Sequence, residues 1–264
     1  MALLNKAKGE IKEIPYDDKQ INVSAVEMSC DDNVDTRVPL PLPQNLSFFM
    51  VLVGRPGSGK STLLHTLTGK VGKNYNKKYD KVFYFNPSNA TLPDDNPFAS
   101  LPEDQRYEDL TAHDLYDCIE EIKGSGDRVL FIFDDCLENL KDKSVQKLIF
   151  KMAYNRRHLA GDGGCVAIML TAQVYNRIPL PVRKCLTHLF LFETANRKEL
   201  ESLFDEWSPC PKNTFFTLLD YIYQGRHDFL FLDTQRKKHE QIHRNFNLLQ
   251  YEGKNIYQQL ADKN

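Results

Sequence analysis

Short apolar runs alternate along the chain with longer amphipathic stretches. The runs are rich in Phe, Val, Ile and Leu, and they predict strands at 47–53, 81–85, 128–133, 165–170, 187–193 and 228–233. The stretches between them place apolar residues at helical spacing, and they predict helices at 60–69, 110–122, 143–159, 196–206 and 213–223. Because strands and helices alternate, we expect an α/β fold in which crossover helices join the strands of a mostly parallel sheet.

The two ends of the chain and one internal segment depart from this alternation. Residues 1–44 are a mixed leader, in which 21–28 predict a short strand and the prolines of 38–43 predict an extended linker. Residues 86–109 carry four prolines and many acids, and they predict a long surface loop. We therefore expect an N-terminal extension and linker at 1–45, one core domain at 46–235, and a polar, locally basic extension at 236–264.

Composition sets three limits. The 264 residues carry a formal net charge of −2, so any contact with nucleic acid must be local rather than driven by the field of the whole protein. The six cysteines, at 30, 118, 136, 165, 185 and 210, lack metal-binding spacing and indicate free thiols in a reducing compartment. No stretch approaches the roughly 18 apolar residues of a membrane span, and the N-terminus lacks a signal-peptide pattern. We expect a soluble intracellular protein.

A glycine-rich loop follows the first predicted strand. Its pattern, G-x-x-x-x-G-K-[ST], is formed by Gly54, Arg55, Pro56, Gly57, Ser58, Gly59, Lys60, Ser61 and Thr62. The glycines permit the positive φ angles and close approach that turn backbone N–H groups toward phosphate oxygens, and the next helix adds its positive end. Lys60 can then reach the β- and γ-phosphates, and the Ser61 hydroxyl can ligate Mg²⁺. The loop predicts that ATP or another nucleoside triphosphate binds here with Mg²⁺.

Two carboxylates end the third predicted strand, in the pattern known as Walker B. We expect Asp134 to hold Mg²⁺ through its water shell, together with Ser61. Asp135 follows at the carboxyl end of the strand, where it can orient or deprotonate an attacking water. Glu138 is the alternative base. Asp135 is shorter than the more usual Glu, and a simpler interpretation makes it a cap for the helix near 143 or a solvated turn residue.

A glutamine at the end of the next strand completes the predicted site. Gln173 can hydrogen-bond the γ-phosphate or its water as a sensor, although a glutamine there could also begin an ordinary loop. The guanine-specific pattern N-K-x-D is absent, and no glycine follows the Walker B acids at the spacing of a GTPase. A small-molecule kinase usually lacks an adjacent catalytic carboxylate, so the pair Asp134 and Asp135 favours hydrolysis.

Arginines and lysines supply the remaining candidates. Ring ATPases complete each site with a guanidinium from a neighbour, and Arg156, Arg157 and Arg183 are candidates for that role. Arg156 and Arg157 could instead complement the end of a helix. The local basic concentrations that could track DNA phosphates are Lys70, Lys73, Lys77, Lys78 and the segment from Arg236 to Arg244, each of which could equally be solvated surface.

Several motifs occur in an order that resembles a viral family. They are the glycine-rich loop, 83–87, 131–135, Arg157-His158, 171–173 and 183–188. The chain from about 46 to 235 resembles the genome-packaging ATPases of poxviruses, other large DNA viruses, virophages and polinton-like elements, within the FtsK/HerA superfamily. The resemblance implies a three-layer P-loop NTPase of the additional-strand catalytic-glutamate type, with core strand order 5-1-4-3-2.

The resemblance also implies a role. It implies a pentameric or hexameric ring that pumps double-stranded DNA into a preformed capsid, with capsid vertex or portal proteins as further partners. The strand-end glutamine of the family falls on Gln173, and its helix-borne arginine falls on Arg157. FtsK-like motors have Glu where this chain has Asp135, but the viral branch also shows Asp-Asp. The setting would be the host cytoplasm, a viral factory or the virion.

We therefore expect a Mg²⁺-dependent ATPase motor for genome packaging. Lys60, Asp135, Gln173 and Arg157 are the predicted catalytic residues, and Ser61 and Asp134 the predicted metal ligands. One rival is a helicase-like or AAA+-type remodelling ATPase. The other is a scaffold or switch that binds ATP without turning it over.

Overall fold

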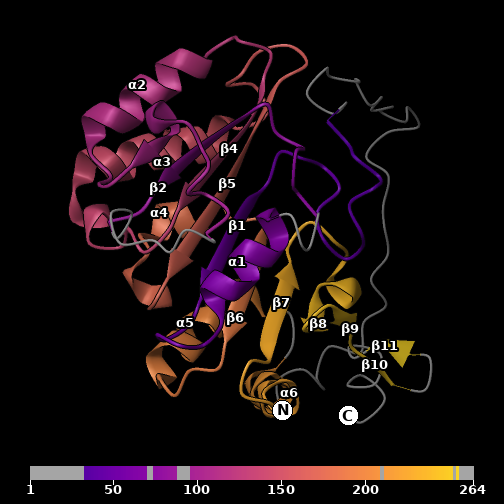
Figure 1. Cartoon of the computed structure of the whole chain (residues 1–264). Helices are drawn as coiled ribbons and strands as arrows, with labels where there is room; N and C mark the ends of the chain where they lie inside the picture. Colours follow the sequence, from indigo (N-terminus) through magenta and orange to yellow (C-terminus); the bar gives the residue numbers. More distant parts are fainter. Residues whose placement is uncertain (1–32, 70–73, 88–95, 209–210, 252–253, 256–264) are drawn as a thin grey trace, which may run out of the picture.

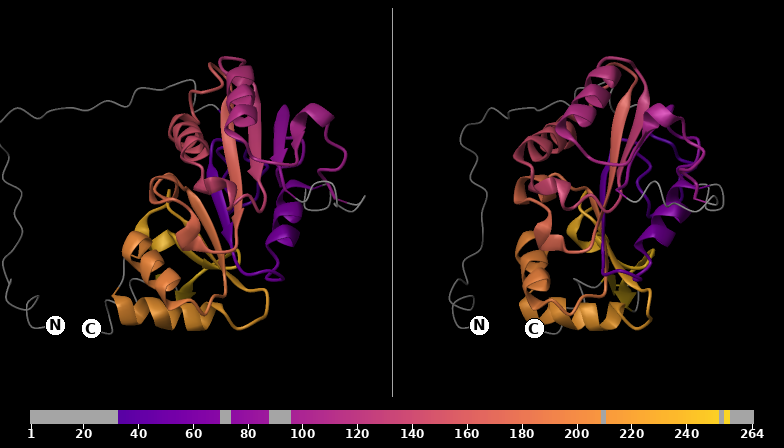
Figure 2. Two further views of the ribbon diagram at one scale, coloured as in Figure 1. Left: turned by 90° about the vertical axis from the view of Figure 1, so that its left-hand side faces the viewer. Right: turned by 60° about the vertical axis from the view of Figure 1, so that its left-hand side comes forward.

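The computed structural model describes residues 33–69, 74–87, 96–208, 211–251 and 254–255. The predicted strand at 21–28, Cys30, Cys210, Lys70 and Lys73 lie outside these residues. Within them a single large sheet crosses the molecule, with helices on both faces (Figures 1 and 2). The architecture is three-layered α/β, as expected from the sequence.

The large sheet has nine strands in the order β3-β2-β4-β5-β1-β6-β7-β8-β9. Their bounds are β1 Phe49–Val53, β2 Lys81–Phe85, β3 Arg106–Tyr107, β4 Arg128–Phe133, β5 Cys165–Ala172, β6 His188–Phe192, β7 Phe229–Asp233, β8 Ile242–Arg244 and β9 Asn247–Leu248. The first six strands of that order, β3, β2, β4, β5, β1 and β6, are parallel to one another, whereas β7, β8 and β9 continue the sheet in antiparallel fashion. Numbered along the chain, the five predicted core strands lie in the order 5-1-4-3-2, which confirms the implied topology.

In the described part of the chain, six α-helices pack on the sheet. Their bounds are α1 Lys60–Thr68, α2 Ala112–Ile122, α3 Lys143–Asn155, α4 Leu180–Arg183, α5 Arg197–Trp207 and α6 Lys212–Ile222. Alternate residues of a strand face opposite sides of a sheet. On β1, Phe49 and Val51 pack with α2, α3 and the later helices, whereas Met50 and Leu52 pack with α1. The core strands are therefore buried on both faces, which explains their continuous apolar runs.

Three expectations about the connecting segments are wrong. The segment 38–43 is not an extended linker: it turns back, burying Val38 and Leu42 in the cluster around α1. The described part of 86–109 is not merely surface loop, because Phe98 is buried and stacks on Tyr84. The basic segment after 235 is not a separate extension, because β8 and β9 join the sheet. Apolar side chains at irregular spacing anchor all three, and no periodic pattern marks them.

The two edges of the large sheet are short. Strand β3 at one edge and β9 at the other have two residues each. A separate two-stranded sheet pairs β10 (Gln250–Tyr251) with β11 (Lys254–Asn255). In the described part of the chain, no helix has the length and apolar character needed to cross a membrane. The cysteines described there, Cys118, Cys136, Cys165 and Cys185, are all free thiols, as expected.

Candidate active site

The glycine-rich loop lies at the carboxyl end of β1, between β5 and β6, and leads directly into α1. Its amide at Gly54 donates to the carbonyl of Ala172 at the end of β5, which fixes the start of the loop. Gly59 has φ +110° and caps α1 in the left-handed region, a conformation that favours glycine. A Cβ at Gly54 would lie 2.6 Å from the Ser58 hydroxyl oxygen, so the loop closes tightly on itself.

Lys60 lies inside this loop and faces the Walker B acids. Its Nζ donates to the carbonyls of Gly54 and Arg55. Burial lowers the pKa of Lys60, while the charges of Asp135 and Asp134 oppose that shift. Within the described ranges the hydrogen bonds of Lys60 are those to these two carbonyls, and a half-buried ammonium held in this way is stabilised by an incoming anion. The buried Ser58 hydroxyl also has no hydrogen-bond partner among the residues that the structure describes, so the loop holds a further polar atom suited to a phosphate ligand.

Asp134 is buried at the end of β4, and hydrogen bonds to both of its carboxylate oxygens hold it in place. Its Oδ1 accepts a hydrogen bond from Thr171 Oγ1 at 2.6 Å. Its Oδ2 accepts from Tyr84 Oη and Asn86 Nδ2, each at 3.2 Å. Burial beside Asp134 raises the pKa of Tyr84, so the phenol remains a donor. An ionised carboxylate has about four acceptor sites, and three are used, which leaves room for one further bond.

Asp135 adopts a strained backbone conformation that turns its carboxylate toward Gln173. Its φ is +58°, which is uncommon for a residue other than glycine. Its amide donates to Thr171 Oγ1 at 2.9 Å, and its Oδ1 accepts from Gln173 Nε2 at 3.0 Å. Asp135 does not cap α3, whose N-terminal cap is Asp142. Strain of this kind is concentrated at functional sites, because the surroundings must hold it in place.

Thr171 is a site residue that the sequence analysis did not single out. It is buried on β5, and its hydroxyl connects the two acids by donating to Asp134 and accepting from the Asp135 amide. Tyr84 and Asn86, at the end of β2, were likewise assigned no role. The signal available in the sequence was a polar residue near the carboxyl end of each strand beside β4, the edge where open α/β sheets bind ligands.

The residues predicted to hold Mg²⁺ have suitable chemistry. Ser61 is exposed at the start of α1, and Asp134 retains one acceptor site next to the loop. Hydroxyl and carboxylate oxygens are the protein ligands that Mg²⁺ takes alongside substrate phosphates. Among the described residues there is no cluster of three or more His, Cys, Asp or Glu side chains that could hold a metal without a substrate. The site therefore fits a metal that arrives with its nucleotide.

Glu138, the alternative base, is held by cations. Its carboxylate pairs with Lys141 and accepts from Arg177 Nη1 at 3.1 Å. The hydrogen bond from Lys141 lowers the pKa of Glu138, which makes it a weaker base than an unpaired glutamate. Glu138 is therefore held by two cations, whereas the carboxylate of Asp135 accepts from Gln173.

The three candidate arginines have different environments. Arg183 is buried, forms an ion pair with Glu206 at 2.6 Å, and lies over the ring of Tyr175. Arg156 donates to the carbonyls of Ser47 and Ala153, and burial lowers its pKa. Both are thus engaged in holding the fold together.

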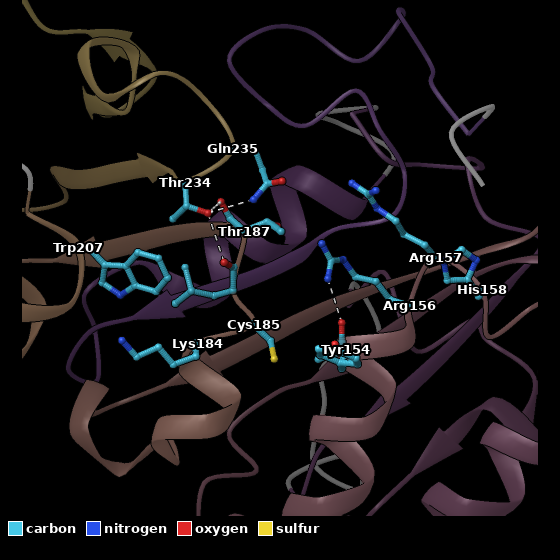
Figure 3. Close-up of a pocket in the computed structure, with 12 residues that line it drawn as sticks. Tyr154, Arg156, Arg157, His158, Lys184, Cys185, Thr187, Trp207, Thr234 and Gln235 are labelled. Carbon is cyan, nitrogen blue, oxygen red and sulfur yellow. Dashed lines mark hydrogen bonds between the residues drawn. The ribbon is translucent and has the colours of Figure 1, made fainter. Parts of the chain in front are cut away.

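Arg157 is exposed and lies next to Arg156 at the edge where the parallel strands begin. Figure 3 shows both arginines beside a cavity of about 490 Å³ that is also lined by Lys184, Thr187 and Gln235. The five residues of β1 separate this edge from the glycine-rich loop by roughly 16 Å, given about 3.3 Å per residue. Arg157 therefore lies away from the glycine-rich loop of its own chain.

The predicted DNA-contacting residues are only partly available. Lys78 is buried and forms an ion pair with Asp35 at 2.6 Å, so it is not a surface cation. In the C-terminal segment, Arg236 lies 3.5 Å from Asp233, and Arg244 lies 2.8 Å from Asp228. Lys77, Lys237 and Lys238 are exposed.

Comparisons with known proteins concern this same core. A model of the NACHT domain family matches residues 49–172, which run from β1 to β5. No curated protein matches the chain in sequence. The genome packaging NTPase B204 from Sulfolobus turreted icosahedral virus 2, solved with ATP-gammaS, has a TM-score of 0.51 at 16% identity. That match covers 78% of this chain and 100% of B204.

Two further solved structures are similar. B204 of Sulfolobus turreted icosahedral virus, a DNA-packaging ATPase, has a TM-score of 0.54 at 15% identity, covering 76% of this chain and 98% of that one. The conjugation coupling protein TcpA of pCW3 has a TM-score of 0.53 at 11% identity, covering 76% of this chain and 60% of that one. At such identities the similarity concerns the fold, and it confirms the resemblance at that level.

Proposed function

Since this chain has the P-loop NTPase fold found in viral packaging ATPases, we propose that it is a Mg²⁺-dependent ATP hydrolase that translocates double-stranded DNA during genome packaging. The observation that carries the hydrolase proposal is the hydrogen-bonded chain from Asp134 through Thr171 and Asp135 to Gln173. It connects the two predicted acids to the predicted sensor at the ends of β4 and β5. A loop that only bound nucleotide would not need such a connection.

The residues divide the chemistry among them. The backbone N–H groups of the loop and Lys60 neutralise the phosphate charge that grows as the γ-phosphoryl group leaves. Asp135 accepts a hydrogen bond from the attacking water and orients it in line with the bond that breaks. Gln173 contacts the same water or the γ-phosphate. Ser61 and Asp134 would hold Mg²⁺, which would supply positive charge to offset that of the phosphates.

Release of the γ-phosphate changes what the sensor contacts. With nucleotide bound, the Gln173 amide divides its hydrogen bonds between Asp135 and the phosphate. After release it keeps the hydrogen bond to Asp135, whose Oδ1 lies 3.0 Å from Gln173 Nε2. Because Asp135 is held in a strained conformation by Thr171, this change is passed into β5. We assign the coupling of hydrolysis to movement to this connection.

Assembly into a ring is supported by the position of Arg157. It is exposed beside Arg156, whose carbonyl accepts from Val166 near the start of β5, at the opposite edge of the sheet from its own loop. A role as finger therefore requires a neighbouring copy. In such a ring each Arg157 contacts the γ-phosphate of the next subunit. Packaging itself is supported by the shared fold, since the DNA-packaging ATPase B204 matches over 98% of its own length.

The test is ATP hydrolysis by the purified chain, with and without double-stranded DNA, alongside measurement of particle mass. We expect stimulation by double-stranded DNA and a species of several subunits in the presence of ATP. Asp135→Ala should reduce kcat by at least about 100-fold, the contribution of a positioned base. Glu138→Gln is the matched control and should retain activity. Full activity in Asp135→Ala would refute the catalytic assignment, and a monomer that DNA does not stimulate would refute the motor.

A further inference from the structure

On the side of the glycine-rich loop that faces away from the two acids, a second loop lies at the same edge of the sheet. The acids lie at the ends of β4 and β5, whereas β6 and β7 lie on the other side of β1. Because β7 is antiparallel to β6, the residues that precede β7 lie at the same edge as the glycine-rich loop. These residues, 224–228, form a short connection from α6 that we call the β7 entry loop.

The β7 entry loop contacts the glycine-rich loop directly. His227 Nδ1 lies 3.0 Å from the carbonyl oxygen of Ser58, so Nδ1 is the protonated nitrogen and donates to it. A Cβ at Gly59 would lie 3.5 Å from the same nitrogen, which means that the imidazole packs against the last turn before α1. His227 thereby restrains the backbone on which the phosphate-binding N–H groups depend.

The β7 entry loop is itself held rigidly. The carboxylate of Asp228 accepts hydrogen bonds from the Gly225 amide at 2.7 Å, from Arg244 Nη2 at 2.8 Å and from Asn245 Nδ2 at 2.8 Å. Asn245 Oδ1 in turn accepts from the amide of Phe229. These bonds hold the pKa of Asp228 at about 2, so the carboxylate is ionised at neutral pH. These bonds therefore fix the backbone that carries Arg226 and His227.

Arg226 lies at the tip of this loop and is exposed. Across the described residues, no hydrogen bond, ion pair or ring contact holds its guanidinium. A cation kept next to a phosphate-binding loop, on a rigid turn and without a carboxylate partner, is suited to a ligand. Arginine also stacks on aromatic planes, which lysine does less well.

The position of the acids sets the direction of the nucleotide. Asp134, Asp135 and Gln173 mark the γ-phosphate end, on the β4 and β5 side of the loop. A phosphate chain cradled by the glycine-rich loop, with its γ end at these acids, would place its nucleoside end on the β6 and β7 side. That is the side on which Arg226 and His227 lie.

We propose that the β7 entry loop is the nucleoside-binding wall of the site, where Arg226 contacts the base and ribose of ATP. His227 is a positioning residue that holds the Ser58 carbonyl and, through it, the shape of the phosphate cradle. The inference rests on the proposed binding of ATP and adds the part of the chain that distinguishes a nucleotide from bare phosphate. Arg226 and His227 therefore have separable effects.

Calorimetric titration of the full chain with Mg-ATP and with inorganic tripolyphosphate separates the effect of Arg226 from that of His227. Arg226→Ala should raise the Kd for ATP about tenfold, or about 1.4 kcal/mol, and leave the Kd for tripolyphosphate unchanged. Arg197→Ala, which removes an exposed arginine on α5, is the matched control and should change neither. An equal effect of Arg226→Ala on both ligands, or none on either, would overturn the role of Arg226.

The His227 variants test positioning. His227→Ala should raise the Kd for Mg-ATP and the Kd for tripolyphosphate by a similar factor, because the glycine-rich loop loses its restraint. His227→Asn keeps an amide donor near the position of Nδ1 and should restore most of the affinity. Failure of that rescue, with melting temperatures unchanged, overturns the positioning role. A wild-type chain that binds neither ligand refutes the proposed function as well, whereas one that binds ATP regardless of Arg226 refutes this inference alone.

Discussion

Removing the Thr171 hydroxyl should disconnect the two acids of the site. Thr171→Val keeps the shape of the side chain but deletes both the donor to Asp134 Oδ1 and the acceptor for the Asp135 amide. A hydrogen bond to a charged group contributes about 1.5–3 kcal/mol, and a neutral one about 1 kcal/mol. We therefore expect the free energy of unfolding to fall by roughly 2–4 kcal/mol in urea titrations.

The catalytic effect has a separate cause. A left-handed backbone conformation costs about 1–2 kcal/mol for a residue with a Cβ, and the bond to Thr171 offsets that cost at Asp135. Without it Asp135 relaxes, and its carboxylate leaves Gln173. We expect kcat to fall by about 100-fold, while the Kd for ATP stays nearly constant because the glycine-rich loop is intact.

Steady-state hydrolysis and equilibrium nucleotide binding measure these effects. Thr171→Ser keeps the hydroxyl and should retain most of kcat, which makes it the matched control. If Thr171→Val retains kcat within about twofold and loses less than about 0.5 kcal/mol of stability, the reasoning from these two bonds is wrong. A large loss of ATP affinity with kcat unchanged would also refute it, since it would place Thr171 in binding rather than in catalysis.

Three further predictions concern ion pairs. Arg183→Ala leaves Glu206 with a nearly buried, unpaired carboxylate and should lower the free energy of unfolding by about 3 kcal/mol, measured in urea. Lys78→Met breaks the pair with Asp35 and should lower the free energy of unfolding by about 1–3 kcal/mol, a loss that is limited because Arg37 still pairs with Asp35. DNA binding, measured by fluorescence anisotropy, should be unchanged. In Asp228→Asn, the free energy of unfolding should fall less steeply as the pH is lowered than it does in the wild type. The lowered pKa of Asp228 stabilises the fold fully above pH 4, and that contribution is lost as the pH falls toward 2.

Each of these has a result that contradicts it. Unchanged stability in Arg183→Ala would return that arginine to the candidates for a finger. Weaker DNA binding by a stably folded Lys78→Met variant would show that Lys78 reaches DNA. An equally steep fall with decreasing pH in wild type and Asp228→Asn would mean that the bonds to Gly225, Arg244 and Asn245 do not depend on the charge of Asp228.

The core of the fold was predictable from the sequence because its strands are buried on both faces. Burial of both faces makes each strand a continuous apolar run, and the glycine-rich loop marks where the first one ends. The resemblance supplied the strand order, which periodicity does not contain. The strands β3, β8 and β9 were missed because they have two or three residues each, too few for a period-two pattern.

The site was predictable only where its chemistry is local in sequence. Asp134 and Asp135 are adjacent, so a pattern finds them, whereas Thr171 meets them from 36 or 37 residues away. Lys78 and Asp35 are 43 residues apart, so their pairing has no local sign, and the lysine was assigned to the surface. His227 lies 169 residues from Ser58, in a stretch with no recognisable motif. Such contacts are set by the order of strands in the sheet.

The shortness of the outer strands has a consequence for assembly. An exposed strand edge joins another chain through its row of unpaired amides and carbonyls, and such a joint is long-lived and hard to reverse. With two residues at β3 and two at β9, the large sheet offers little for such pairing. In the proposed ring, subunits would instead meet through side chains, as Arg157 would with a neighbour's phosphate. Contacts of that kind can open and close once per catalytic cycle, which a joint between sheets could not do.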